Sequence, residues 1–272
     1  MINTFLPLAD VQNMPDNRQI PLRKVGIKNI RYPITVLDKT KGTQQTVASV
    51  NMYVNLPHQF KGTHMSRFVE ILNEYRREIN VKTFAKILAE MKNRLDSKEA
   101  HLEVDFPYFI EKQAPVTKTT GLMEYGCGLH GTMTDRFDMM LVVIVPITTV
   151  CPCSKEISDY GAHNQRGEVR AWVRFDRFLW LEDVIAEVEK ASSSDIYSVL
   201  KRPDEKFVTE RAYERPMFVE DVVRTVCQGL KALKGVTWFA VEAENFESIH
   251  NHSAYACTTQ ENSVKKRISA SN

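Results

Sequence analysis

The chain has 272 residues, of which 43% are hydrophobic and 26% charged, and its formal net charge is +2. These values are typical of a globular protein with ample length for a core, built as one large domain or two of ordinary size. Basic residues barely outnumber acidic ones, 36 against 34, which argues against a dedicated nucleic-acid binder. No apolar run approaches the roughly 18 to 20 residues that span a membrane.

The first half of the chain predicts the order strand, strand, helix, helix, strand, strand. Strand-like runs at residues 24–36 and 46–56 flank a polar turn containing Gly42. Two stripes of apolar residues at helical spacing follow, from Phe68 to Ile79 and from Phe84 to Leu95. Residues 100–110 and about 116–126 then look extended.

The second half of the chain predicts the same order of strands and helices. Residues 132–150 and 165–175 predict strands, and an apolar stripe from Leu181 to Val188 predicts a helix. A longer helix begins near Pro216 and ends at Gly235, as the preferences of proline and glycine at helix ends favour. Residues 236–246 and 253–259 predict the last strands, while residues 192–215 are polar and weakly patterned. The sequence therefore predicts an α+β fold of two ββααββ units.

The cysteines and the N-terminus favour a cytoplasmic protein. Residues 1–21 lack the basic start and apolar centre of a secretory signal. The cysteines are odd in number and do not suggest a disulfide framework in a chain of this length. They are Cys127, Cys151, Cys153, Cys227 and Cys257. We expect free thiols, and neither a membrane nor a nucleic acid as partner.

Two thiols and an imidazole follow the most apolar run of the sequence, residues 139–150. Cys151 and Cys153 lie in residues 151–155 (CPCSK), and His163 lies in residues 162–166 (AHNQR). Thiolate and imidazole suit Zn²⁺ and, less exclusively, other first-row divalent ions. Cys-x-Cys is not the Cys-x-x-Cys spacing of zinc ribbons, however, and free cysteine is often a small core residue. Spacing alone favours the two interpretations about equally.

Residues 151–155 and 161–167 (GAHNQRG) closely resemble the signature of the type IB GTP cyclohydrolases, which begin folate and related pterin biosynthesis. The resemblance covers nearly the whole chain, including residues 61–68 (KGTHMSRF) and 247–252 (ESIHNH). It implies the tunnelling fold, in which paired modules and then subunits join antiparallel sheets into barrels, with active sites at subunit interfaces and a homotetramer. Residues 1–127 would form the N-terminal module, and residues 128–272 the C-terminal module with the metal site.

The resemblance implies metal-dependent hydrolysis of GTP to 7,8-dihydroneopterin triphosphate and formate. C8 of guanine must be hydrated and released as formate, and a divalent metal assists by lowering the pKa of bound water. Cys151 is implied as a catalytic thiolate ligand, His163 as the imidazole ligand and Glu205 as the carboxylate ligand. Without the resemblance, Glu205 reads as a solvated acid. This donor set accepts Zn²⁺, Mn²⁺ or Fe²⁺.

His250 is implied as the residue that transfers protons, since histidine titrates near physiological pH, and His252 is its nearby competitor. The resemblance also implies Glu220, early in the long helix, as the carboxylate that reads N1–H and the exocyclic amine of guanine. Glu220 lies about 120° around that helix from the valine stripe, so it faces solvent or a cleft.

A helix start near residues 61–67 favours anions through its free N–H groups and its dipole. The triphosphate is therefore expected there, with a helix cap by Ser66 and exposed bases as the alternative interpretation. The candidate residues are Lys61, His64, Ser66 and Arg67.

Three other functions fit parts of the pattern. An archaeal relative of the family releases a cyclic phosphate product. A purine- or pterin-binding module would need Glu220 but no metal that activates water. A protein with structural zinc would have a closed site of four ligands.

Overall fold

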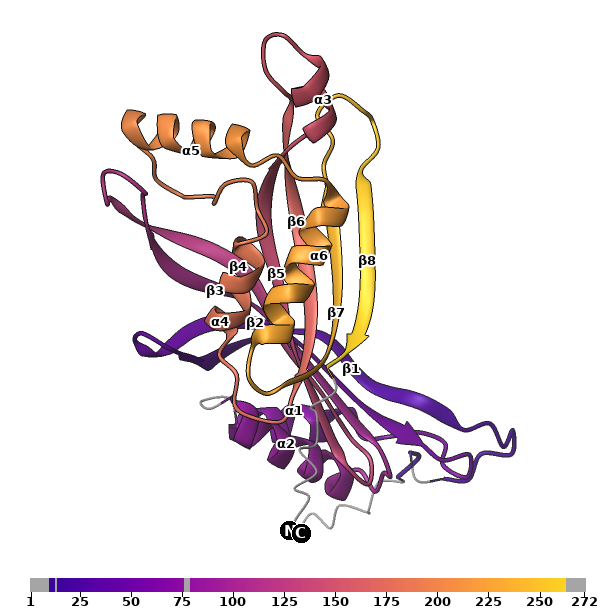
Figure 1. The fold of residues 1–272 in the computed structure, drawn as a ribbon. Coiled ribbons are helices and arrows are strands. Elements are labelled where there is room, and N and C mark those ends of the chain that lie inside the picture. The colour runs from indigo at the N-terminus through magenta and orange to yellow at the C-terminus, as the bar shows by residue number, and fades with distance from the viewer. Residues whose placement is uncertain (1–9, 13, 76–78, 263–272) are drawn as a thin grey trace, which may run out of the picture. The chain divides into compact units, whose positions relative to one another are not determined.

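The computed structural model describes residues 10–12, 14–75 and 79–262. It is an α+β protein whose eight strands follow one another in the order β1 to β8 (Figure 1). The pairs β1–β2, β2–β3, β5–β6, β6–β7 and β7–β8 are antiparallel. The α+β class and the antiparallel pairing are confirmed, whereas barrels assembled across subunits stay a prediction.

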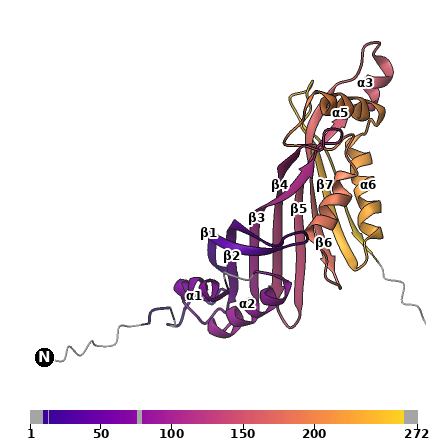
Figure 2. The ribbon, with the colours of Figure 1, turned by 90° about the vertical axis from the view of Figure 1, so that its left-hand side faces the viewer.

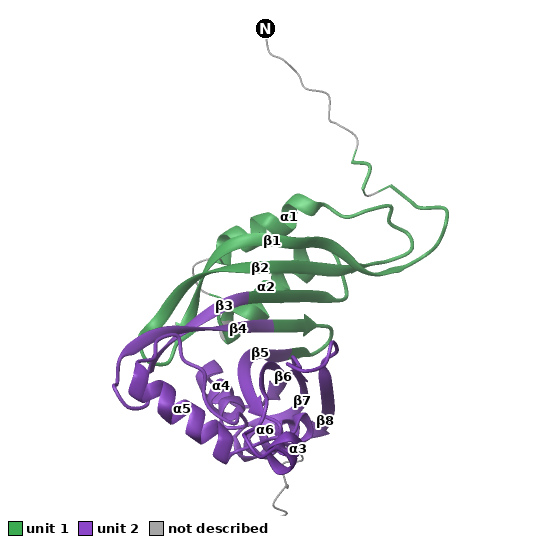
Figure 3. Ribbon diagram, turned by 90° about the horizontal axis from the view of Figure 1, so that it is seen from above, with its two compact units in different colours: residues 1–105, 130–138 green, residues 106–129, 139–272 purple. Residues whose placement is uncertain are grey.

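Contacts within the chain define two compact units, coloured separately in Figure 3. Unit 1 comprises residues 1–105 and 130–138, and unit 2 comprises residues 106–129 and 139–272. Strands β3 (Ala100–Gln113), β4 (Thr120–Met133) and β5 (Phe137–Val150) contribute residues to both units. The division into sequence modules 1–127 and 128–272 stays a prediction.

Unit 1 is built from the hairpin of β1 (Leu22–Asp38) and β2 (Gly42–Leu56), followed by α1 (Met65–Tyr75) and α2 (Val81–Arg94). Figure 2 shows both helices on one side of these strands. Alternate residues of β2 are buried because a strand points every second side chain to the same face. They form a core with apolar residues of the two helices, and the largest contributors are Met52, Phe68, Ile71, Leu72, Phe84, Ile87, Leu88 and Met91.

Unit 2 contains β6 (Asn164–Phe175), β7 (Val236–Asn245) and β8 (Ala254–Glu261) beside β5. Helix α6 (Val219–Ala232) packs against β7 and β8, and also contacts α4 (Leu181–Glu189). The apolar stripe of α6 is buried as predicted: Val219, Val222, Val223, Val226, Cys227 and Leu230. None of the helices within the described residues is long and apolar enough to cross a membrane.

Three sequence predictions of secondary structure are corrected. The single strand at residues 132–150 is wrong, because a turn in which Thr134 N–H donates to the Arg136 carbonyl separates β4 from β5. Ile79, which the apolar stripe predicts to be helical, lies between α1 and α2 and donates its N–H to the carbonyl of Thr35 at 3.2 Å. The long helix begins at Val219 and not near Pro216, and the Asp221 carboxylate caps the N–H of Phe218 at 3.2 Å.

The second half also holds two helices that the pattern did not identify, α3 (Pro152–Ile157) and α5 (Arg202–Glu214). Helix α5 lies inside the polar stretch 192–215, and Asp204 is its single buried residue. A helix that is polar on nearly every face leaves no apolar stripe to read.

Candidate functional site

Cys151 lies in the first position after β5 and caps the N-terminus of α3. Its sulfur accepts the N–H of Ser154 at 3.5 Å, and Pro152 begins the helix. The thiol is half-buried, whereas Cys153, the second residue of α3, is exposed. The helix start therefore directs the two thiols into different surroundings.

His163 lies beside Cys151 because β5 and β6 are antiparallel neighbours. Val150 and Asn164 form the last residue pair between the two strands. The loop that connects the strands therefore begins and ends side by side. The N–H of Cys151 donates to the carbonyl of His163 at 3.1 Å. In turn, the N–H of His163 donates to the hydroxyl of Ser154 at 3.2 Å. The two expected ligand residues are thus fixed to each other through their backbones.

The loop between β7 and β8 brings a third motif to this place. The hydroxyl of Ser248 lies 3.3 Å from Nδ1 of His163, and Glu247 lies 3.5 Å from the amide of Gln165. His250 and His252 lie further along the loop, both exposed, with their rings stacked 5.0 Å apart. Motifs that are nearly 100 residues apart in sequence therefore meet around His163.

Three consecutive buried serines, Ser192, Ser193 and Ser194, which the sequence pattern does not mark as site residues, hold the end of β5. The hydroxyl of Ser193 accepts the N–H of Val150 at 3.1 Å, and the N–H of Ser193 donates to Thr148 at 2.9 Å. Ser192 accepts the N–H of Thr148 at 3.2 Å. The carbonyl of Val150 accepts the N–H of Met217 at 3.0 Å. These bonds satisfy the backbone N–H and carbonyl groups just before Cys151 and so fix the position from which its side chain extends. The available signal was three adjacent small polar residues after an apolar helix.

Glu205 occupies an exposed position in the first turn of α5. Its neighbour Asp204 is fully buried and accepts the N–H groups of Val116 and Thr117, each at 2.9 Å. Asp204 therefore anchors α5 to the turn between β3 and β4. At the other end of the helix, the carbonyl of Tyr213 accepts Nζ of Lys155 at 2.6 Å.

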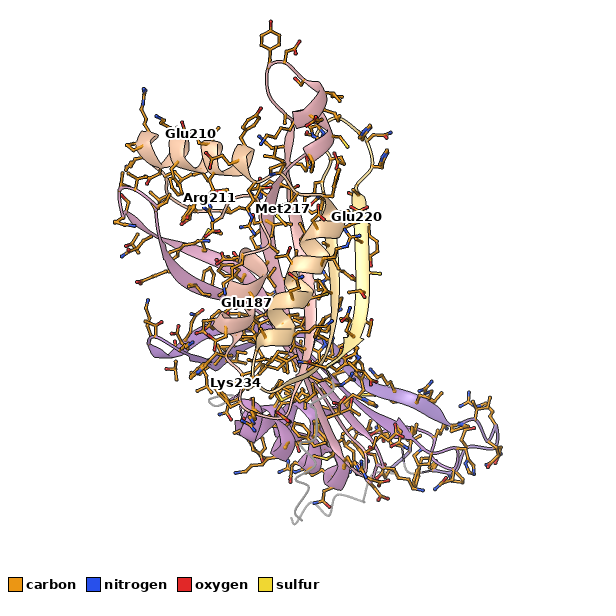
Figure 4. The ribbon with its side chains drawn as sticks, viewed as in Figure 1. Glu187, Glu210, Arg211, Met217, Glu220 and Lys234 are labelled. Carbon is orange, nitrogen blue, oxygen red and sulfur yellow. The ribbon has the colours of Figure 1, made fainter. Side chains whose placement is uncertain are left out.

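Glu220 lies in the first turn of α6 and is exposed, as expected for a position outside the valine stripe. Figure 4 shows it at the N-terminal end of the helix, close to Met217. It lines one end of a groove of about 460 Å³ between α6 and β8. The groove also carries Arg224, Gln228 and Lys231 from α6. Glu220 thus faces both solvent and a cleft.

The residues expected to bind phosphate lie in unit 1. Helix α1 begins at Met65, so Ser66 is inside the first turn and is not the cap. Nε2 of His64 lies 3.3 Å from the carboxylate of Asp10, and Arg67 donates to the carbonyl of Arg94 at 2.8 Å. His64 and Arg67 both line a hollow of about 70 Å³ that Lys61 and Ser66 do not line.

The remaining thiols differ from Cys151 in their surroundings. Burial raises the pKa of the Cys127 thiol and also that of the Cys227 thiol, which lies in the core as expected. Cys257 is exposed on β8. A thiol held neutral by burial is a poor metal ligand, because the ligand is the thiolate.

The donor types around β5 and β6 fit a divalent metal. Cys151 and His163 supply one sulfur and one imidazole in a half-buried loop, which are donors that Zn²⁺ and related ions accept. Among the described residues, however, no three side chains of His, Cys, Asp or Glu come together closely enough to hold an ion. The structure thus brings Cys151 and His163 together but leaves Glu205 apart.

Comparisons with known proteins agree with the sequence motifs. A family model described as type I GTP cyclohydrolase folE2 matches residues 8–256. GTP cyclohydrolase FolE2 of Syntrophobacter fumaroxidans is 61% identical over 252 residues, which cover 92% of this chain and 98% of that protein. GTP cyclohydrolase FolE2 of Syntrophotalea carbinolica is 60% identical over 249 residues, with 92% and 94% covered. The solved uricase from Arthrobacter globiformis aligns over 88% of this chain and 93% of its own at a TM-score of 0.49 and 8% identity, too distant to bear on function.

The fold and the site define an α+β protein with a candidate metal centre between two neighbouring strands of unit 2. The chain belongs to the type I GTP cyclohydrolase FolE2 family.

Proposed function

We propose that this protein hydrolyses GTP to 7,8-dihydroneopterin triphosphate and formate in the cytoplasm, as the first step of folate and pterin biosynthesis. The observation that carries the proposal is the meeting of three separate motifs at His163: the Cys151 loop, the start of β6 and the β7–β8 loop. Family membership supports the same reaction, and five free thiols suit a reducing compartment.

Cys151, His163 and Glu205 are the residues that would hold a divalent metal, with Zn²⁺, Mn²⁺ and Fe²⁺ as candidates. A metal bound there would supply Lewis-acid chemistry for the hydration of C8. The protein's own part is to fix the donors. Cys151 and His163 are locked to each other by a backbone hydrogen bond of 3.1 Å, which limits the reorganisation needed when a ligand binds.

Glu205 would reach this centre from another subunit of a homotetramer. Within one chain, Tyr213 of α5 contacts Lys155 of α3, and Glu205 lies eight residues back along the same helix, about 12 Å along its axis. The exposed side of α5 is then free to approach a second copy. A ligand set that is incomplete among the described residues of one chain agrees with an active site at a subunit interface.

His250 would move protons at the ring nitrogens and the ribose, because it is exposed on a loop whose neighbour Ser248 contacts His163. Glu220 would accept N1–H and the exocyclic amine of guanine at the end of the α6–β8 groove. Lys61, His64, Ser66 and Arg67 would hold the triphosphate, with His64 and Arg67 nearest to a hollow.

The test is to incubate the purified protein with GTP and each of Zn²⁺, Mn²⁺ and Fe²⁺ in turn. The proposal expects formate and a fluorescent pterin in equal amounts, and phosphorus NMR should show a linear triphosphate. A cyclic phosphate product would point to the archaeal type of reaction. Nucleotide binding without formate would identify a binding module, and a tightly held metal without either would identify structural zinc.

A further inference from the structure

Gln165 is a buried polar side chain that has no role in the proposed function. It lies at the start of β6 with only 6% of its surface exposed. Its Oε1 lies 3.1 Å from Nδ1 of His163. Its Nε2 donates to the hydroxyl of Thr149 at 3.0 Å and points to a carboxylate oxygen of Glu247 at 3.5 Å. The amide therefore bridges the ring of His163 and an acidic side chain.

The carboxylate of Glu247 decides which way the amide of Gln165 points. A carboxylate can only accept hydrogen bonds, whereas a hydroxyl such as that of Thr149 can donate or accept. If the amide were turned over, its oxygen would face the oxygen of Glu247 and the two would repel. The NH₂ group therefore faces Glu247, and the oxygen faces His163.

The orientation of the amide in turn fixes the imidazole ring. An amide oxygen accepts hydrogen bonds, so Nδ1 of His163 must carry a hydrogen, and in the neutral ring Nε2 then keeps its lone pair. Ser248, 3.3 Å from the same Nδ1, fits either tautomer because its hydroxyl can donate or accept. Gln165 is thus the neighbour of Nδ1 that selects between them.

We propose that Gln165 is a positioning residue that holds His163 in the Nδ1–H tautomer, so that Nε2 is the atom offered to the metal. The proposal rests on the proposed role of His163 as a metal ligand. A hydrogen bond to the second ring nitrogen is the general means by which proteins orient metal-binding histidines. Here the chain of contacts runs from Glu247 through Gln165 to His163.

The tautomer can be measured without any metal. Nitrogen-15 NMR of histidine-labelled protein, with His163 assigned from the signal lost in His163→Ala, separates protonated from unprotonated ring nitrogens. The expected result is a protonated Nδ1 in the wild type and a mixture of tautomers in Gln165→Met. The double variant Gln165→Glu with Glu247→Gln keeps the acceptor toward His163 and places an amide donor opposite it, so it should again show a protonated Nδ1. A protonated Nε2 in the wild type, or no change in Gln165→Met, would overturn the proposal.

Metal affinity gives the second readout. Gln165→Met should bind Zn²⁺ roughly tenfold to a hundredfold more weakly, the usual effect of removing such a partner. Val169→Ala, a buried change further along β6, is the matched control for lost stability and should bind normally. Equal weakening in the control would reduce Gln165 to a packing residue. If His163→Ala binds Zn²⁺ like the wild type, the proposed ligand is wrong, while the NMR result still decides the tautomer.

Discussion

Asp204 and Thr117 are joined by two hydrogen bonds, one from the Thr117 hydroxyl at 2.7 Å and one from its N–H at 2.9 Å. The N–H of Lys201 donates to the same carboxylate at 2.9 Å. This contact secures the helix that carries Glu205 to the turn between β3 and β4. A buried carboxylate with several donors is strongly favoured in its charged form.

The contact predicts acid sensitivity. Burial by itself would raise the pKa of Asp204, but the hydrogen bonds from Thr117, Lys201 and Val116 outweigh it and hold the pKa below its ordinary value. Because the pKa of Asp204 is lower in the folded than in the unfolded protein, its charged form contributes stability above the pKa of the unfolded chain, about 4. This contribution is lost as the pH falls below that value. As the pH is lowered from about 5, the temperature of thermal unfolding should therefore fall more steeply for the wild type than for Asp204→Asn.

Glu210→Gln is the matched control, because Glu210 lies on the same helix and forms an ion pair with Lys206 at the surface, at 3.7 Å. Its curve should follow the wild type. Parallel curves for the wild type and Asp204→Asn would show that Asp204 does not anchor α5 through its charge.

The two stacked histidines should differ in function. His250→Ala is expected to keep its metal and to lose roughly 10²- to 10⁴-fold in kcat, the usual contribution of a positioned acid or base. His252→Ala, which removes the ring stacked on it at 5.0 Å, should lose only a few-fold. Steady-state kinetics with metal analysis tests both. Loss of metal in His250→Ala would show that His250 is a metal ligand. A larger loss of kcat in His252→Ala than in His250→Ala would show that the two histidines have the opposite roles.

Glu220 is expected to determine base selectivity. In Glu220→Gln the amide NH₂ would replace one acceptor and face a donor of guanine. Hydrogen bonds to charged groups contribute about 1.5 to 3 kcal/mol, so GTP should bind roughly tenfold to a hundredfold more weakly. ATP has neither N1–H nor a 2-amino group and should change little.

Calorimetric titration of the metal-loaded proteins with both nucleotides measures this. Gln228→Ala, which alters the same groove further along α6, is the control and should not discriminate between the bases. Equal weakening of GTP and ATP in Glu220→Gln would show that Glu220 does not read the base.

A site shared between subunits predicts complementation. Cys151→Ala and Glu205→Ala should each be inactive. Oligomers refolded from equal amounts of the two variants should regain activity at up to about a quarter of the sites. Random pairing places an intact Cys151 next to an intact Glu205 of another subunit at that fraction of the interfaces. Mixing Cys151→Ala with His163→Ala is the control and should restore nothing. If the Glu205 mixture also stays inactive although mixed oligomers form, all three ligands belong to one chain.

Much of the site could be predicted from the sequence because its motifs lie at the ends of strongly patterned strands. The apolar run before Cys151 identified β5, and antiparallel pairing with the next strand then brings His163 to the same place. Glu220 was placed outside the core from helical spacing alone, and the structure agrees.

The features that could not be predicted depend on polar contacts between residues that are far apart in the sequence. The anchoring of α5 needs Asp204 and Thr117, which are 87 residues apart, and no periodicity links them. Pro203 and the acidic residue after it were helix-start signals, but the helix has no apolar stripe. The orientation of Gln165 at the start of β6 depends on Glu247 in the loop between β7 and β8. Such contacts follow only from the folded backbone.

The proposed hydrolysis at Cys151 is tested with GTP labelled with carbon-13 at C8, supplied to metal-loaded wild type and to Cys151→Ala. The thiol lies in a connection after β5, so its loss should leave the circular dichroism spectrum and the thermal unfolding of the metal-free protein nearly unchanged. We expect labelled formate from the wild type, matched one-to-one by pterin, and neither formate nor bound metal in the variant. Labelled formate released by Cys151→Ala at the wild-type rate would contradict the proposal.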